Sequence, residues 1–311
     1  MNKHILFVHI PKTAGTSFRK AAHEYFGAKN IFFDYSPASP ETSKLINETI
    51  YHKNDPYAFY KSVSTLDKSF LSGHYPMAKY APLYDVLNIV SFVRDPVEQV
   101  VSHYNHYKNN YNYNKDLSDF IKEPGFINLQ SRLLNYIPSL FCGFIGLTEE
   151  YNASIDLFND MYDMDLQHMY VNVKQEGSLD TVNIDKSILD EIEKLNEKDI
   201  NLYNSVKKQF SVRIELYKKN LPFTYGHIQK NNKDRLAGIA FQQNTDESIA
   251  IDIYRDDIIV ETVYTNKFRP ALAMNNMPRK GFIGFDYDRN EKDIGKGNLY
   301  AVVKDTGQKI V

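Results

Sequence analysis

Short continuous apolar runs alternate with longer, polar-punctuated stretches through the first two thirds of the chain. Residues 4–10 and 86–93 are unbroken β-prone runs, which are typical of strands buried on both faces of a parallel sheet. Strands that alternate with helices predict a three-layer α/β domain with a mostly parallel sheet, over residues 1–222. The predicted helices lie at 17–26, 97–108, 116–122, 128–136, 149–162 and 186–219, with one more near 41–51, and further short strands lie at 70–72, 144–147 and 169–173.

The pattern changes near residue 235. Ile249, Ile251 and Ile253 alternate with other residue types, and a polar turn at 255–257 leads into a second β-prone run at 258–264. Such a pair of runs predicts a β-hairpin. Further strands at 237–242, 281–287 and 298–304 predict a small all-β, sandwich-like domain over residues 235–311, with an accessory role. The polar run at 230–234 predicts a solvated linker between the two domains.

Composition narrows the classes of partner. The chain has 311 residues, 42% of them hydrophobic and 24% charged, with a net charge of −2. A balanced charge gives no basis for bulk binding of nucleic acid or of a membrane surface, so any anion site must be local. One cysteine cannot form an internal disulfide, and no apolar run approaches eighteen residues. We therefore expect a cytoplasmic protein without an integral membrane segment; the sequence does not indicate an oligomeric state.

A candidate anion-binding loop follows the first strand. The string Pro11–Ser17 stands between a strand and a helix, and Gly15 is expected to let the backbone approach an oxyanion closely. Either Thr16 or Ser17 is expected to cap the helix. The free N–H groups of the helix start and the hydroxyls of Thr16 and Ser17 supply donors, and Lys12 adds a charge. The lysine precedes the glycine, so this P-loop-like turn is not a Walker A motif.

A second motif follows the buried run at 86–93. Arg94 comes at the carboxyl end of that strand, where α/β sheets place ligands, and Ser102 lies two turns along the next helix. Asp95, Pro96 and Glu98 form a helix-start signature. A guanidinium and a hydroxyl can together hold a terminal phosphate, although a serine inside a helix is weak evidence on its own.

The two motifs together resemble those of the PAPS-dependent carbohydrate sulfotransferases, closest to the heparan and chondroitin uronosyl 2-O-sulfotransferase branch and its bacterial relatives. The resemblance covers roughly residues 4–220 and includes the stretches 128–132 and 146–149. It implies the donor 3′-phosphoadenosine 5′-phosphosulfate (PAPS), the product adenosine 3′,5′-bisphosphate, a carbohydrate acceptor and no metal. The cofactor-binding residues that it implies are Lys12, Thr13, Ala14, Gly15, Thr16, Ser17, Arg94, Ser102 and, on a late basic loop, Lys174.

Sulfuryl transfer is an in-line displacement that needs charge stabilisation and a base. Lys12 is placed to neutralise the leaving phosphate oxygen. His74 follows the short strand at 70–72, on the side of the sheet where the cofactor is expected, and its ordinary pKa of about 6.5 suits a general base. A histidine that is merely hydrogen-bonded within a loop is the alternative, and His9 or Glu24 are the competing bases.

The acceptor side is less defined. Gln130 and Arg132 can contact either cofactor or acceptor, and Tyr104 begins an aromatic stretch that can stack on a sugar. A solvated helix face or a surface loop explains these residues almost as well. Two other functions remain open: a P-loop nucleotide kinase, and a non-catalytic glycan-binding protein that keeps the fold.

Overall fold

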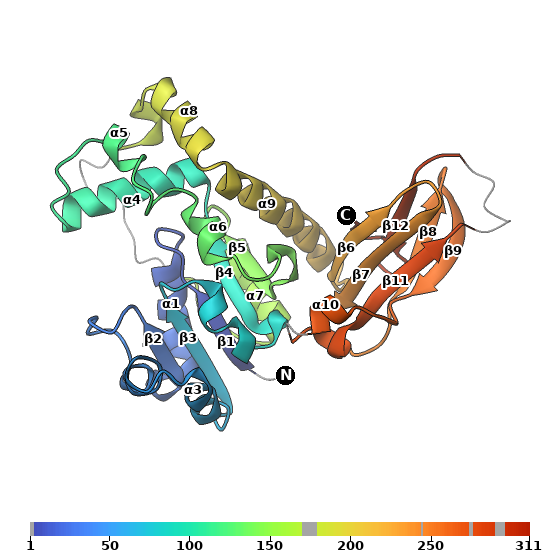
Figure 1. Ribbon diagram of the computed structural model, residues 1–311, viewed down its shortest axis with the longest axis horizontal. Helices are drawn as coiled ribbons and strands as arrows, with labels where there is room; N and C mark the ends of the chain where they lie inside the picture. Colours follow the sequence, from blue (N-terminus) through green and yellow to red (C-terminus); the bar gives the residue numbers. More distant parts are fainter. Residues whose placement is uncertain (1–2, 170–178, 244, 274–275, 290–295) are drawn as a thin grey trace. The chain divides into compact units, whose positions relative to one another are not determined.

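The computed structural model describes residues 3–169, 179–243, 245–273, 276–289 and 296–311, and the chain forms two compact units (Figure 1). The first unit comprises residues 1–84 and 88–210, and the second comprises residues 85–87 and 211–311. The division falls inside the long helix α9 (Glu197–Lys218).

The first unit contains a five-stranded parallel sheet with the strand order β2-β3-β1-β4-β5, which confirms the predicted α/β class. Its strands are β1 (Lys3–Val8), β2 (Ile31–Asp34), β3 (Lys68–Gly73), β4 (Ile89–Val93) and β5 (Phe144–Leu147). β1 is the central strand, with β3 on one side and β4 on the other. The strand order reverses between β1 and β4, and α/β sheets bind ligands beyond the carboxyl ends of such neighbouring strands.

Apolar side chains on both faces explain why this sheet is the core of its unit. Ile5, Leu6, Phe7 and Val8 are all 0% exposed, so β1 is buried on both faces, as its continuous apolar run predicts. Aromatic rings from the first helix and from neighbouring strands surround Phe7, with ring centroids 4.8 to 6.4 Å apart. This packing fixes the strand ends from which the candidate site is built.

The helices of this unit follow most of the predicted positions. Their bounds are α1 (Gly15–Phe26), α2 (Lys44–Ile46), α3 (Pro56–Val63), α4 (Pro96–Asn110), α5 (Leu117–Phe120), α6 (Leu129–Leu133), α7 (Tyr151–Tyr162), α8 (Lys186–Leu195) and α9. The predicted single helix at 186–219 is wrong, because it is broken at Asn196. That side chain accepts a hydrogen bond from the Asn128 backbone N–H (2.7 Å) and helps to cap α6. The strand predicted at 169–173 lies almost wholly outside the described residues.

The second unit is a pair of antiparallel four-stranded sheets, ordered β10-β11-β7-β6 and β13-β12-β8-β9. The strands are β6 (Thr224–Asn231), β7 (Arg235–Gln242), β8 (Ala250–Arg255), β9 (Ile258–Tyr264), β10 (Lys267–Phe268), β11 (Phe282–Asp288), β12 (Leu299–Val303) and β13 (Lys309–Ile310). The short helices α10 (Pro270–Ala273) and η8 (Pro278–Gly281) lie between β10 and β11. Buried residues of both sheets form one apolar core, which confirms the predicted all-β, sandwich-like region and its β8–β9 hairpin.

The linker predicted at 230–234 is wrong. Strand β6 runs through Asn231, and Asn232 accepts backbone hydrogen bonds from Asp234 and Arg235 in a tight turn to β7. Two polar residues of this segment, Lys230 and Asn231, belong to an edge strand with one exposed face, and the rest form the turn.

No helix among the described residues is long and apolar enough to cross a membrane.

Candidate active site

The loop between β1 and α1 has a strained backbone. Lys12 and Ala14 adopt left-handed conformations (φ 66° and 61°), although neither is a glycine. Such conformations cost about 1–3 kcal/mol each and are typical of functional sites. Left-handed residues that alternate with others can turn successive N–H groups towards one concave side, which is a common way to bind an anion.

Helix α1 begins at Gly15, and Ala14 is its N-cap residue. The prediction that Thr16 or Ser17 caps the helix is therefore wrong, because both residues lie inside the first turn. The Thr13 hydroxyl is buried and donates to the Ile10 carbonyl (2.9 Å), so it closes the loop. The free backbone N–H groups of the first turn and the helix dipole remain as anion-binding features.

The absence of a side chain at Gly15 makes room for the ring of His9, which the sequence did not indicate. A Cβ at this position would lie 2.0 Å from Cδ2 and 2.3 Å from Nε2 of His9. The hydrogen of Gly15 therefore faces a histidine ring of the protein. Helix α4 also holds the loop, because the buried Gln99 side chain donates to the Pro11 carbonyl (3.0 Å).

Lys12 and Arg94 bring two positive charges to the carboxyl ends of β1 and β4. Burial, followed by the charge of Arg94, lowers the pKa of Lys12. In the part of the chain that the structure describes, no carboxylate lies within ion-pair distance of Lys12, whereas Arg94 contacts Glu98 (3.2 Å). A half-buried lysine next to an arginine is a site that an anion would stabilise.

The backbone of Arg94 is held by one buried side chain. Gln130 is 0% exposed; its Oε1 accepts from the Arg94 N–H (3.0 Å) and its Nε2 donates to the Arg94 carbonyl (2.9 Å). Asp95 accepts hydrogen bonds from Val97 and Glu98, which confirms it as the predicted N-cap of α4. These hydrogen bonds fix the backbone at Arg94 and at the start of α4.

The remaining predicted site residues are distributed as follows. Ser102 is partly buried on α4, two turns after Arg94. Tyr104 is 2% exposed and packs in the aromatic core around α4 and α5, so its ring is not available to stack on a sugar in this conformation. Arg132 is exposed and donates to the Pro124 and Gly125 carbonyls. Lys174 lies outside the described residues.

Gln130 is not accessible to a ligand in this conformation. Both of its amide atoms bond to the Arg94 backbone, and the side chain is completely buried. The structure therefore gives this residue a positioning role. Its own backbone N–H is held by Asp199 (3.0 Å), at the start of α6.

His74 lies directly after β3, with its ring beside those of His9 (centroids 4.4 Å apart) and Tyr35 (4.8 Å). Its Nδ1 is 2.7 Å from the His9 carbonyl oxygen. A carbonyl only accepts, so Nδ1 carries the hydrogen and the Nε2 of the neutral ring keeps its lone pair. The side chain is exposed, but protein atoms crowd one side of the ring, and this desolvation lowers the pKa of His74. Nε2 therefore stays unprotonated to lower pH than in a free histidine.

Two further residues that the sequence did not single out, Tyr35 and Arg19, complete this side of the site. The Tyr35 hydroxyl is 2.9 Å from Nδ1 of His9 and 2.9 Å from Nη1 of Arg19, and Arg19 also pairs with Glu41 (2.5 Å). Burial, followed by the charges of His74, Arg19 and Lys12, lowers the pKa of His9. His9 is 5% exposed, which removes it as a competing base for an external substrate.

Glu24 is remote from the loop. It is exposed near the end of α1, nine residues after Gly15, which corresponds to about 13 Å along the helix axis.

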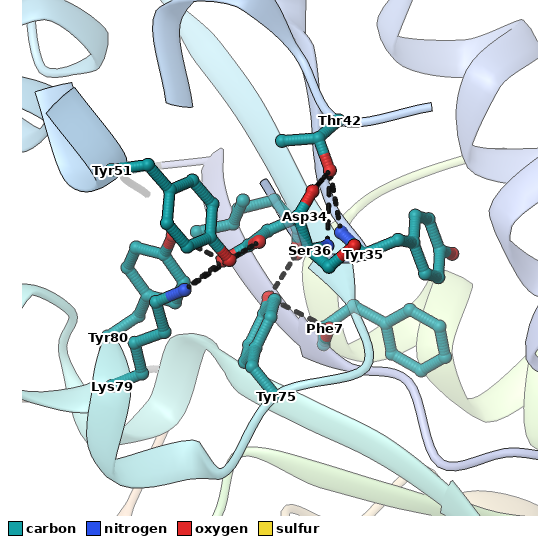
Figure 2. Close-up of polar contacts among 10 residues, drawn as sticks. Phe7, Asp34, Tyr35, Ser36, Thr42, Tyr51, Tyr75, Lys79 and Tyr80 are labelled. Carbon is teal, nitrogen blue, oxygen red and sulfur yellow. Dashed lines mark hydrogen bonds and ion pairs between the residues drawn. The ribbon is translucent and has the colours of Figure 1, made fainter. Parts of the chain in front are cut away.

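A buried polar network anchors the strand that precedes Tyr35 (Figure 2). Asp34 is 2% exposed and accepts hydrogen bonds from Tyr51 (2.6 Å), Lys79 (2.6 Å) and Tyr80 (2.7 Å). Lys79 also donates to Tyr51 (2.9 Å). A buried carboxylate with this many donors is fully satisfied, so it fixes the end of β2.

The neighbour of His74 is anchored in the same region of Figure 2. The Tyr75 hydroxyl lies 3.2 Å from the Phe7 carbonyl and 3.3 Å from the Leu71 carbonyl, and so connects β1 and β3. His74 is thus held both by its own ring nitrogen and through the next residue.

Two histidines of α4 contribute to the same electrostatic field. His103 is buried among Tyr107, Phe120 and Phe126, and burial, followed by the charges of His106 and Lys12, lowers its pKa to about 3. Burial and the charge of Lys12 also lower the pKa of His106. In the described residues, no group of three or more His, Cys, Asp or Glu side chains could hold a metal ion.

Comparisons with known proteins give little beyond this geometry. No family model and no curated protein matches the chain. Retinol dehydratase in a complex with retinol and PAP matches with a TM-score of 0.36 and 12% identity, over 64% of this chain and 81% of the other. Retinol dehydratase in complex with androsterone and inactive cofactor PAP matches with a TM-score of 0.30 and 13% identity, over 64% of each chain. Similarities this weak support no conclusion about activity.

Proposed function

We propose that this protein is a sulfotransferase that moves a sulfuryl group from PAPS to a carbohydrate hydroxyl. The observation that carries the proposal is the pair Lys12 and Arg94, which stand at the carboxyl ends of adjacent strands, one of them without a carboxylate partner in the described residues. The motifs around both residues resemble those of PAPS-dependent sulfotransferases. The loop with its helix start suits a 5′-phosphosulfate, and Arg94 with Ser102 suits a 3′-phosphate.

PAPS supplies an activated sulfuryl group, which leaves its phosphate oxygen as the acceptor oxygen forms a bond to sulfur. Lys12 stabilises the negative charge that develops on the leaving phosphate oxygen, and the amides of the loop assist. His74 accepts the proton of the acceptor hydroxyl at Nε2, the nitrogen that the His9 carbonyl leaves unprotonated. The products are a sulfate ester, adenosine 3′,5′-bisphosphate and a protonated His74, which then returns its proton to water.

The residues present fit this donor. Arg94 contacts Glu98 at the first turn of α4, and a 3′-phosphate would compete with that carboxylate for the guanidinium. This ion pair is partly open to solvent and contributes only about 0–1 kcal/mol, so a phosphate can displace it readily. Gln130 keeps the Arg94 backbone in place while the side chain changes partner.

Calorimetric titration with adenosine 3′,5′-bisphosphate and with ATP tests the donor assignment. The bisphosphate should bind far more tightly, and Arg94→Ala should weaken it at least tenfold, since charge-assisted hydrogen bonds contribute about 1.5–3 kcal/mol each. Equal affinities for the two nucleotides would reject the assignment. Transfer of radiolabelled sulfate from PAPS to a panel of polysaccharides and glycolipids then tests the acceptor class, with a steroid and a phenol as non-carbohydrate controls.

A further inference from the structure

The imidazole ring of His9 fills the space that Gly15 leaves beside the anion loop. Only a hydrogen fits on the Gly15 Cα, because a Cβ would lie 2.0 Å from the ring. The ring also stacks on Phe7 (centroids 5.5 Å apart), so it is packed from the strand side as well. A shift of this ring therefore requires a shift of the loop, and the reverse.

The same residue orients His74 from two directions. Its carbonyl oxygen lies 2.7 Å from Nδ1 of His74, and its ring lies 4.4 Å from the ring of His74. The bond to the carbonyl selects the tautomer, and the ring contact removes water from one side of the imidazole. One residue thus touches both the loop and the candidate base.

The ring of His9 is itself held in a single orientation. Its Nδ1 is 2.9 Å from the Tyr35 hydroxyl, which Arg19 contacts from α1 at 2.9 Å. Tyr35 follows Asp34, whose buried network fixes the end of β2. The hydrogen bond and the packing together leave the ring little freedom.

We propose that His9 is a positioning residue that couples the anion loop to His74, so that the phosphate-binding backbone and the base keep one relative geometry. The importance of this coupling for catalysis rests on the proposed function. The contacts of His9 with Gly15 and His74 do not depend on it, because they lie within the protein. A substitution that displaces the loop should therefore also change the orientation and solvation of His74.

A double-mutant cycle with Gly15→Ala and His9→Ala tests the steric part. Gly15→Ala should weaken adenosine 3′,5′-bisphosphate binding at least tenfold, because the methyl group displaces the ring and with it the loop. In the double variant the methyl group occupies the vacated space, so its affinity should equal that of His9→Ala within about twofold. Losses that simply add would overturn the proposal. Gly125→Ala is the matched control, since a Cβ there meets nothing within 4 Å.

The effect of His9 on the pKa of His74 is measured by an NMR titration of the histidine imidazole signals, without any substrate. In His9→Ala the backbone carbonyl that holds Nδ1 of His74 remains, but the His74 ring loses its contact with the His9 ring and gains water, so its pKa should rise towards about 6.5. An unchanged pKa of His74 would contradict the coupling. His9→Asn serves as a second, smaller polar variant if His9→Ala does not fold. The other groups whose charges act on His74 stay unchanged in these variants: Arg19 on α1, Glu41 after β2, and His106 on α4.

The two hypotheses fail in different ways. If the wild-type protein binds no bisphosphate and transfers no sulfuryl group, the proposed function fails, while the NMR titration still decides the coupling. If the wild-type protein is active and the His9 and Gly15 effects are additive with an unchanged His74 titration, the proposed function stands and the coupling is rejected. In an active protein, the acid limb of the turnover profile of His9→Ala should move to higher pH together with the pKa of His74.

Discussion

Replacement of Gln130 by leucine should damage the site without removing any residue that touches a ligand. Gln130 is fully buried, and its amide makes two hydrogen bonds to the Arg94 backbone, at 3.0 and 2.9 Å. Leucine has a similar size but leaves one N–H and one carbonyl without those partners. An unsatisfied buried polar group costs about 1–3 kcal/mol, and water can reach part of the half-buried Arg94, so the expected loss is about 2–4 kcal/mol in the free energy of unfolding.

The same change should release the Arg94 backbone. If the guanidinium then no longer points towards the 3′-phosphate, bisphosphate binding should weaken by tenfold or more. Urea denaturation followed by near-ultraviolet circular dichroism gives the stability, and calorimetry gives the affinity. Arg132→Ala is the control on the same helix: its exposed guanidinium bonds only to loop carbonyls, and the loss should stay below about 1 kcal/mol. If stability and nucleotide affinity were unchanged and only the KM for the acceptor rose, Gln130 would contact the acceptor, and the positioning role would be refuted.

Three further predictions concern charge and protonation. Lys12→Ala should lower kcat more than it weakens bisphosphate binding, since its charge matters most as the leaving oxygen becomes anionic; steady-state kinetics and calorimetry would contradict this if binding alone suffered. His74→Ala should lower turnover roughly 10²–10⁴-fold with nucleotide affinity nearly intact, and the wild-type acid limb should lie below about pH 6.5 because the pKa of His74 is lowered; recovery of full activity by His74→Asn would show that the residue only positions the sugar. The buried His103 should make the fold less stable as pH falls from about 6.5, its unfolded value, towards about 3, because only the unfolded chain takes up the proton readily. His103→Phe should flatten that dependence in urea titrations between these pH values, and an unchanged slope would assign acid sensitivity to other groups.

The sequence predicted the parts of the site that depend on local order. The strand–loop–helix at β1 and α1 and the cap at Asp95 follow from short-range patterns of apolar runs, proline and acceptor side chains. Strand β2 was not predicted, because four residues beside a Pro-rich segment give too short a signal. With β2 missing, Tyr35 and its contacts with His9 and Arg19 could not be placed.

Other features depend on contacts between distant residues, which one sequence does not contain. Gly15 was expected to admit an anion, whereas its missing side chain accommodates a ring six residues earlier in the chain. Gln130 and Tyr104 were expected to face a ligand because their residue types suit one, but burial assigns them to the interior. Residues 230–234, the end of β6 and the turn after it, were predicted to be a linker because an edge strand keeps polar residues on its open face.

The left-handed conformations of Lys12 and Ala14 determine when the loop becomes ordered. Their conformational cost is met once, as the protein folds, and the hydrogen bonds of Thr13 and Gln99 to neighbouring carbonyls keep the loop in that shape afterwards. An incoming anion therefore meets amides that already point in fixed directions and does not have to order a flexible segment. Binding energy that would otherwise be used to organise the backbone remains available for discrimination between anions by shape and charge distribution. In this sense selectivity is set during folding, by two residues that are not glycine.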